Sequence, residues 1–307
     1  MNSIAIIIPA YNAAPWLAEV IESALAQSHP AASVVVVDDG STDDTAAQAE
    51  KFGDAIMLLR QPNAGVCAAR NHGAAQVSAE GLLFLDADDR LRPDALESLA
   101  DRATQGPFGA VYGRTVDFTG DRRLGDERGD CAMQGPPPAG ARASFWKAPI
   151  STPGAVLLRR DVFESAGRWD ERFNTTADRH LWCRVGALAE FGFIHHLVLE
   201  RRMHESNMSG DKNRARRQAV EVQFSFLDWC ARRGLDTGFL ETSEQKILER
   251  NVERAVQERA FTAARWIAEE AARRGIAGEA FRRAQRLANM PGLARELELK
   301  VRGFLGL

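Results

Sequence analysis

The stretch Gly81–Arg90, GLLFLDADDR, joins an apolar segment to a dense acidic one. The four apolar residues that follow the glycine predict a buried strand. Three carboxylates, Asp86, Asp88 and Asp89, then fall within four positions. Like charges at this spacing repel one another, whereas a turn needs only one or two acidic residues. The crowding therefore indicates that something of opposite charge meets the end of this strand.

Upstream of this stretch, short apolar runs alternate with helical patterns. Strands are predicted at residues 3–9, 33–39 and 55–60, and helices at 14–27, 42–52, 65–77 and 92–103. Continuous apolar strands separated by helices are typical of a mostly parallel sheet covered on both faces. The fold class is therefore α/β.

The rest of the chain changes character twice. Residues 117–143 are rich in Gly, Pro and charge, which predicts a long loop, either a mobile flap or a plain linker. A strand and helix return within 153–167, and a further strand is predicted at 193–201. From residue 211 the periodicity is helical. We therefore predict an α/β domain at 1–210 and an all-helical C-terminal region at 211–307.

Composition and charge narrow the class of protein. The 307 residues are 45% hydrophobic and 26% charged, as expected of a soluble globular chain. The net charge of -3 argues against bulk nucleic-acid binding, although residues 211–307 hold 19 Lys/Arg against 14 Asp/Glu. That mildly basic region can be a solvated helix face, or it can meet an acidic partner or an anionic membrane surface.

The remaining composition points to the cytoplasm. The four cysteines form no C-x-x-C pair, which favours a reducing compartment and no zinc site. Pro9 interrupts the N-terminal apolar run and no basic segment precedes it, so no signal peptide is expected. No window approaches 18 consecutive apolar residues. We predict a cytoplasmic protein, with peripheral contact at the inner face of the membrane as an alternative.

Polar residues gather where the predicted strands end, and ligands bind at that edge of an open parallel sheet. The fingerprint G-x-G-x-x-G and the P-loop lysine are both absent, so the usual phosphate cradles are missing. A divalent cation, Mn²⁺ or Mg²⁺, can hold a diphosphate instead, using one or two carboxylates. An Asp-x-Asp pair such as Asp86 and Asp88 suits that task, although any acidic turn can produce the pair.

Four segments in this order resemble the nucleotide-sugar-binding half of family 2 glycosyltransferases, which have the GT-A fold. They are IIIPAYNAAPWLAEVIESALAQS (6–28), VVVVDDGSTDDT (34–45), NAGVCAARNHGA (63–74) and LLFLDADD (82–89). The similarity continues through residues 157–173, 178–184 and 201–209, and the tail lies outside it. The resemblance implies an inverting, metal-dependent transfer of a sugar from a nucleotide-sugar donor, commonly a UDP-sugar.

The resemblance also assigns roles to residues of the predicted rim. Asp39 matches an aspartate that accepts a hydrogen bond from the base, Asp86 the ribose-binding aspartate and Asp88 a metal ligand. His204 matches a histidine that often reaches the metal or diphosphate. The other positions matched to nucleotide binding are Pro9, Ala10, Tyr11, Asn63, Gly65, Arg70 and Ala87. Structural alternatives are an Asx turn at Asp38 and a surface position for Arg70.

A general base must accept the proton of the acceptor hydroxyl. In the family this base belongs to a Glu-Asp pair before a Leu-Trp-x-Arg helix, and Asp178 matches the Asp while Ala177 replaces the Glu. The alternative is that Asp178 only caps the helix. His180 and Trp169 are candidate contacts for the acceptor, which the resemblance implies to be a glycan or lipid-linked sugar.

Three functions are consistent with these patterns. The first is the glycosyltransferase itself, and the second is a catalytically silent nucleotide-sugar-binding or scaffold protein, which Ala177 and the helical tail would suit. Nucleotidyl transfer to a sugar phosphate is disfavoured, because PAYNAAPW (9–16) lacks the glycine-rich basic loop that it needs. The amphipathic tail can pack on the first domain, form a homodimer or lie on a membrane.

Overall fold

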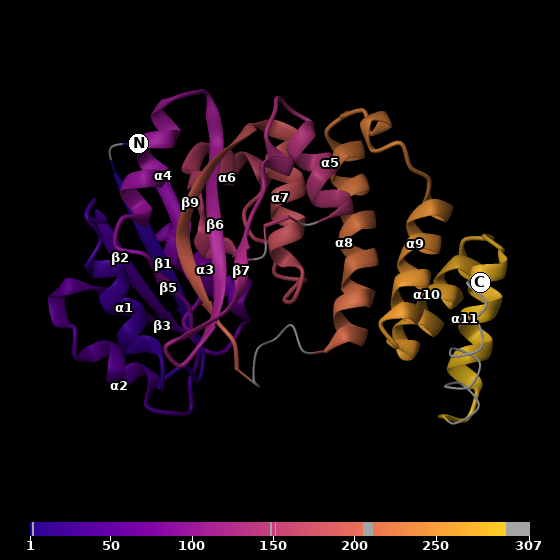
Figure 1. Cartoon of the computed structure of the whole chain (residues 1–307), viewed down its shortest axis with the longest axis horizontal. Helices are drawn as coiled ribbons and strands as arrows, with labels where there is room; N and C mark the ends of the chain where they lie inside the picture. The colour runs from indigo at the N-terminus through magenta and orange to yellow at the C-terminus, as the bar shows by residue number, and fades with distance from the viewer. Residues whose placement is uncertain (2, 148, 151, 205–210, 293–307) are drawn as a thin grey trace. The chain divides into compact units, whose positions relative to one another are not determined.

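A computed structural model describes residues 1–292, apart from residues 2, 148, 151 and 205–210 (Figure 1). The chain divides into two compact units, residues 1–207 and 208–307. The predicted boundary at residue 210 lies outside the described residues. In the described part of the chain, the strands belong to the first unit and the second unit is helical.

The first unit is built on one mixed sheet, nine strands in the described residues, in the order β3-β2-β1-β4-β8-β6-β9-β5, with β7 paired to β6. Strands β1 to β4 are mutually parallel, while β8 runs antiparallel to both β4 and β6. The bounds are β1 Ile4–Ala10, β2 Ser33–Asp38, β3 Met57–Arg60, β4 Gly81–Phe84, β5 Arg90–Leu91, β6 Phe108–Thr119, β7 Arg122–Arg128, β8 Val156–Arg159 and β9 Glu190–Arg202. The prediction of an α/β fold with a mostly parallel sheet is confirmed for its N-terminal half.

Helices cover both faces of the central parallel strands, which explains why β1, β2 and β4 are almost wholly buried and mostly apolar. The helices of the first unit are α1 Leu17–Leu25, α2 Thr45–Glu50, α3 Val66–Ala75, α4 Ala95–Thr104, α5 Ala139–Trp146, α6 Arg160–Ala166 and α7 Ala177–Leu188. Alternate side chains of β1 share one core with α1 and α4, whereas Val35 and Val37 of β2 pack with Ala69 of α3. At Gly73 a Cβ would lie 2.7 Å from Cγ2 of Ile7, so the glycine allows α3 to approach the sheet closely.

Residues 117–143 are not a long loop, and that prediction is wrong. Strand β6 extends to Thr119, turns at Gly120 with a φ of 54°, and returns as β7. Val116 and Phe118 are buried, whereas β7 is largely exposed, which is why its sequence is polar. Helix α5 follows. The sheet partners of β6, on β8 and β9, stabilise a segment whose local sequence favours turns.

The second unit contains four α-helices in its described residues: α8 Lys212–Arg232, α9 Glu244–Gln257, α10 Phe261–Arg273 and α11 Glu279–Asn289. One apolar core joins them, including Val252 of α9, Ile267 of α10 and Phe281 of α11. Their exposed faces carry Arg–Glu pairs four residues apart, such as Arg265–Glu269. These pairs interleave charges of both signs along the helix surface.

Two of the compositional expectations can be compared with the structure. All four cysteines are free thiols; Cys131 is exposed, and Cys67, Cys183 and Cys230 are buried. None of the helices in the described residues has both the length and the apolar character needed to cross a membrane.

Candidate active site

The carboxyl ends of β1, β2 and β4 meet at one edge of the sheet. Ala10 of β1 pairs with Asp38 of β2, and Ile7 pairs with Phe84 of β4. Leu85 continues this pairing by donating its N–H to the Ile7 carbonyl at 2.9 Å. The polar residues that follow the three strands therefore share one rim, as the alternating sequence pattern predicts.

One part of the rim is organised around Asp39, which is 3% exposed. Its carboxylate accepts hydrogen bonds from Nε2 of Gln61 at 2.7 Å and from the backbone N–H groups of Ala64 and Gly65, both at 2.9 Å. Gly40 completes this arrangement with a φ of 73°, and a Cβ there would lie 2.7 Å from the backbone nitrogen of Asn63. We call these residues, Asp39, Gly40, Gln61 and 63–65, the Asp39 cluster.

The first loop of the sheet lies beside this cluster. Pro9 and Ala10 are buried, whereas Tyr11 is 52% exposed, one of the few large hydrophobic side chains on the surface of the part of the chain that the structure describes. Asn12 has a φ of 49° and accepts a hydrogen bond from the Thr42 N–H at 2.8 Å. The two loops are thus fastened together, and an exposed aromatic face stands at their edge.

Asp38 stabilises the turn after β2, although by a wider contact than the predicted Asx turn. Its Oδ1 accepts a hydrogen bond from the Ser41 N–H, three residues further along, at 3.0 Å, whereas an Asx turn joins residues two apart. Of the two neighbouring aspartates, Asp38 shapes the turn and Asp39 holds the loop at 61–65.

Asp86 is paired with Arg70, which lies on α3 and is 5% exposed. The distance from Nη2 of Arg70 to Oδ1 of Asp86 is 2.6 Å, and the guanidinium lies 4.4 Å from the centre of the Trp169 ring. The cation is therefore held between a carboxylate and an aromatic face. Arg70 is not the surface residue of the alternative interpretation.

Asp88 and His204, the two predicted metal ligands, are brought together. Oδ2 of Asp88 lies 2.9 Å from Nε2 of His204. The His204 ring stacks on Trp16, with 4.1 Å between the ring centres and 20° between the planes. Trp16 directly precedes α1, so the helix contacts the strand-end loop through this pair.

Asp89 faces a different partner. It is 2% exposed and accepts the backbone N–H of Arg202 at 2.9 Å. Thr152 makes longer contacts from its hydroxyl to Asp89 and Asp86, at 3.3 and 3.4 Å. Each of the three crowded carboxylates thus has a protein partner of its own. We call Asp86, Asp88, Asp89, Arg202 and His204 the Asp88 cluster.

Burial and mutual repulsion disfavour the ionised state of this cluster. Burial raises the pKa of Asp88, and the neighbouring charge of Asp86 adds to the effect against the opposing effect of His204. The pKa of Asp89 is raised more strongly, by burial and then by Asp88 and Asp86. Ionised carboxylates at this position are therefore a ready binding site for added positive charge.

Asp178, the predicted general base, lies in the first turn of α7. Burial raises its pKa to about 6, and the charges of Arg70 and Asp86 also act on it, in opposite directions. Its Oδ1 accepts the N–H of the next residue, Arg179, at 2.7 Å. The capping alternative is therefore true in part, because the carboxylate satisfies one N–H of the helix start while it shares the electrostatic environment of the Arg70–Asp86 pair.

The start of α7 is fixed by hydrogen bonds from buried side chains. Arg184, 3% exposed, donates to the carbonyls of Ala166 at 2.7 Å and Arg168 at 2.8 Å. Asn71 of α3 donates to the Trp169 carbonyl at 2.9 Å and accepts its N–H at 3.1 Å. The loop that leads to Asp178 is thereby attached to the same helix that carries Arg70.

Three further positions that the sequence placed at or near the acceptor side of the site are buried. Trp169 and His180, the predicted acceptor contacts, are each 2% exposed, so in this structure neither presents a face to an acceptor. Trp169 packs beneath Arg70, and burial lowers the pKa of His180 to about 3, which keeps its ring neutral. Ala177 is also buried, at the first position of α7.

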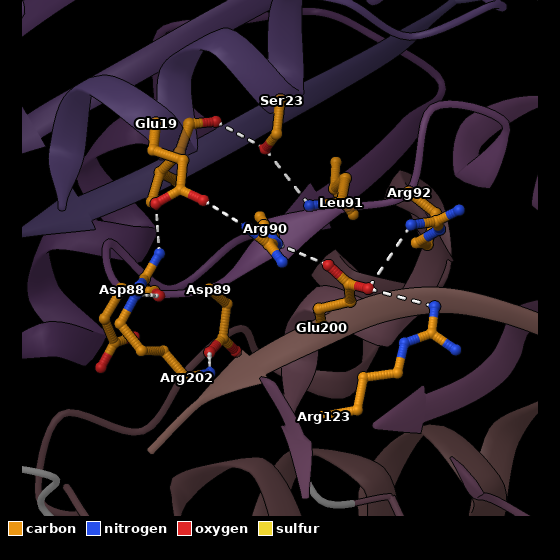
Figure 2. Close-up of polar contacts among 11 residues, drawn as sticks. Glu19, Ser23, Asp88, Asp89, Arg90, Leu91, Arg92, Arg123, Glu200 and Arg202 are labelled. Carbon is orange, nitrogen blue, oxygen red and sulfur yellow. Dashed lines mark hydrogen bonds and ion pairs between the residues drawn. The ribbon is translucent and has the colours of Figure 1, made fainter. Parts of the chain in front are cut away.

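Neither the sequence patterns nor the family resemblance assigns a role to four further residues of the site. They are Trp16, Glu19, Thr152 and Arg202. The carboxylate of Glu19 binds the guanidinium of Arg202, 183 positions away, as well as Nη1 of Arg90 at 2.6 Å (Figure 2). Spacing along the chain cannot reveal pairs of this kind, because they depend on how β9 meets α1 in three dimensions.

The residues present fit a divalent cation that also binds phosphate. Ligand atoms on neighbouring corners of an octahedral ion with bonds of about 2.1 Å lie about 3.0 Å apart, and Asp88 and His204 are separated by a similar 2.9 Å. In the described residues no group of three or more His, Cys, Asp or Glu side chains forms a metal cluster. Should a cation bind here, phosphate oxygens or water would have to complete its shell.

The site thus combines an acidic rim with the buried Arg70 and with Asp178, a carboxylate whose pKa is raised by burial. The sequence model of "Glycosyl transferase family 2" matches residues 5–167, just over half of the chain. The chain belongs to that family.

Proteins similar to this chain agree with the assignment. An uncharacterized glycosyltransferase of Rickettsia conorii is 27% identical over 73% of this chain, and one of Rickettsia typhi is 28% identical over 66%. The matched part spans only 38% and 64% of the length of these relatives. A crystal structure of residues 1–349 of S. aureus TarS in complex with UDP-GlcNAc superposes with a TM-score of 0.61 at 19% identity, over 93% of this chain and 90% of that one. This likeness shows the GT-A fold.

Proposed function

We propose that the protein is an inverting, metal-dependent glycosyltransferase that transfers a sugar from a UDP-sugar to a hydroxyl of a glycan or glycolipid. The observation that carries the proposal is the position of Asp178. Burial raises the pKa of its carboxylate to about 6, and the charges of Arg70 and Asp86 act on it. The charge of Asp86 also acts on Asp88, the partner of His204. A base of this pKa is mostly ionised at neutral pH and can still hold a proton once it accepts one.

The donor would bind across the rim. The Asp39 cluster and the exposed ring of Tyr11 offer a surface for the nucleoside, with one lone-pair position of Asp39 left after its three hydrogen bonds. Asp86 would accept a hydrogen bond from ribose. The UDP-GlcNAc and UDP complexes of TarS, which has the same fold, support uridine as the nucleoside.

Asp88 and His204 would hold the cation, which supplies charge stabilisation to the diphosphate leaving group. Because one of the two protein ligands is an imidazole, we propose Mn²⁺ ahead of Mg²⁺, which prefers an all-oxygen shell. Arg70 supports the same side by orienting Asp86 through its hydrogen bond.

The transfer itself needs one displacement. The acceptor oxygen forms a bond to the anomeric carbon, its proton moves to Asp178, and the bond from that carbon to the diphosphate oxygen breaks with its electron pair. A single displacement inverts the anomeric centre.

Peripheral membrane contact and a homodimer through the second unit stay predictions, and we expect a cytoplasmic location because UDP-sugars are the proposed donors.

The test is donor turnover with Mn²⁺ in the wild type and in Asp178→Asn. We expect Asp178→Asn to lower kcat by about 10²- to 10⁴-fold, with UDP affinity unchanged, and NMR of the product to show an inverted anomeric configuration. Asp54→Asn, an exposed aspartate on another part of the surface, is the matched control. If the wild type binds UDP but neither hydrolyses nor transfers sugar from any donor, the silent binding protein is the correct alternative.

A further inference from the structure

The Asp88 cluster contains a residue that no ligand role explains. Arg202 is the last residue of β9 and its side chain is 11% exposed. Its backbone N–H donates to Oδ1 of Asp89 at 2.9 Å, and its Nε donates to the carbonyl of Asp88 at 3.0 Å. One residue thus holds both the backbone and a side chain of the acidic turn.

The far end of Arg202 reaches helix α1. Its Nη2 is paired with the carboxylate of Glu19 (Figure 2). Its guanidinium also lies 4.5 Å from the centre of the Phe118 ring. The guanidinium therefore has three partners, which are the Asp88 carbonyl, the Glu19 carboxylate and the Phe118 ring. A planar guanidinium can contact all three at once because its donors point in fixed directions. A lysine ammonium in the same place could not.

The start of α1, with the residue before it, contacts the end of β9 and the segment after it at two points. Glu19 binds Arg202, and Trp16, directly before the helix, stacks on His204 two residues further along. The acidic turn contacts the same segment twice, through Asp88 with His204 and through Asp89 with Arg202. The segment 202–204 is therefore held between α1 on one side and the acidic turn on the other.

Further ion pairs, centred on Glu200 of β9, stabilise this arrangement. Arg90 bridges Glu19 at 2.6 Å and Glu200, and Arg92 and Arg123 contact Glu200 at 3.4 and 3.3 Å (Figure 2). Glu200 is two residues before Arg202 on β9 and its side chain is 6% exposed. The network fixes the strand end and becomes more exposed toward Arg123, whose side chain is 50% exposed.

From these contacts we propose that Arg202 and Glu19 are positioning residues that set the distance and orientation between Asp88 and His204. The proposal rests on the proposed function for the cation that this pair would hold, but the arrangement is a property of the protein without it. Arg202 touches neither donor nor acceptor in this account and acts through the two ligands.

The first measurement reads the position of His204 without any metal. Stacking at 4.1 Å on Trp16 shifts the ring proton signals of His204 upfield in the NMR spectrum, and His204→Gln assigns them. In Arg202→Met and in Glu19→Gln we expect this upfield shift to decrease. Arg123→Met, the same substitution at the exposed edge of the network, should leave it unchanged. Thermal melts confirm that each variant is folded.

The second measurement is the affinity for Mn²⁺ in the presence of UDP. Residues that orient metal ligands typically affect metal affinity by about 10- to 100-fold, and we expect a loss in that range for Arg202→Met and for Arg202→Lys. Affinity for UDP without metal should change less than about twofold, because the Asp39 cluster is intact; that split is not expected of general destabilisation.

The outcomes separate the two proposals. An unchanged His204 signal in Arg202→Met would overturn the positioning role, whatever the activity of the variant. Rescue of Mn²⁺ affinity by Arg202→Lys would also overturn it, because charge alone would then suffice. A wild type that binds no Mn²⁺ would instead refute the metal dependence of the proposed function, and the His204 signal would still decide the role of Arg202.

Discussion

The two clusters of the rim hold their carboxylates in different ways. In the Asp39 cluster, a buried aspartate accepts two backbone N–H groups and one amide, all from the segment 61–65. In the Asp88 cluster, one carboxylate is paired with a guanidinium, one with an imidazole and one with a backbone N–H, and burial and mutual repulsion raise the pKa values of Asp88 and Asp89. The first cluster is thus stable as it stands, whereas the second becomes more favourable when positive charge is added.

This difference separates stability from chemistry within one rim. A carboxylate held by backbone donors keeps its geometry when a ligand arrives, which suits recognition of a rigid base. Carboxylates that repel one another favour a cation, and a buried carboxylate of raised pKa can accept a proton. We therefore expect substitutions in the Asp39 cluster to lower stability and substitutions of ionised catalytic carboxylates to lower activity while they raise stability.

The largest effect on stability is expected for Asp39→Ala. Removing the carboxylate leaves three donors without an acceptor, and we expect a loss of about 2 to 4 kcal/mol in the free energy of unfolding. Asp38→Ala is the matched control, since Asp38 is also buried but its carboxylate holds the single Ser41 N–H. Urea unfolding of both variants measures the comparison. Equal losses would show that the Asp39 cluster has no special structural role.

The next effect is a pH dependence that comes from Asp178. Its pKa is about 6 in the folded protein, raised by burial against the opposing effects of the Arg179 N–H and Arg70, and about 3.9 when unfolded. The folded state therefore binds the proton more tightly than the unfolded state. The protonated Asp178 thus contributes stability that is fully present below about pH 4 and is lost as pH rises through 6.

Asp178→Asn removes that dependence. Relative to the wild type, we expect the variant to gain up to about 3 kcal/mol of stability above pH 7 and to gain little at pH 4. Unfolding followed at both pH values measures the difference, and Asp54→Asn is again the exposed control. A variant that is less stable than the wild type at pH 8 would show that the hydrogen bond to Arg179 outweighs the burial of the charge.

The sequence predicted the two clusters to different depths. The strand ends, and with them Asp39, Asp86 and Asp88, follow from local alternation of apolar runs and helices. Resemblance to the family added the pairing of Asp88 with His204 and a role for Asp178. These are the parts of the site set by short segments and by the order of the strands.

What could not be predicted depends on contacts between distant segments. The hairpin of β6 and β7 has a turn-like sequence and forms a strand only because β8 and β9 offer it partners. Arg202 joins Glu19 and the acidic turn across more than one hundred positions. In a chain with many arginines, the charge of Arg202 alone does not indicate a role in the site. The burial of Trp169 and His180 likewise depends on how α3 and α7 pack.

The smallest effect separates strain from crowding at one glycine of the Asp39 cluster. Gly40 has a φ of 73°, and a Cβ there would meet the Asn63 backbone nitrogen at 2.7 Å, whereas Gly53 has a φ of 49° and open space around it. A left-handed conformation alone costs an alanine about 1 to 2 kcal/mol, so Gly53→Ala measures strain. We expect Gly40→Ala to exceed it by about 1 kcal/mol, because the loop at residue 63 must move.

That movement should also reach the proposed nucleoside surface. Asn63 precedes the two N–H groups that Asp39 holds, so Gly40→Ala is expected to weaken UDP binding without metal, while Gly53→Ala leaves it unchanged. Mn²⁺ affinity should be the same in both variants, because the Asp88 cluster does not include this loop. If Gly40→Ala lowered Mn²⁺ affinity and spared UDP, the two clusters would be coupled through the sheet rather than independent, and the division of the rim would be wrong.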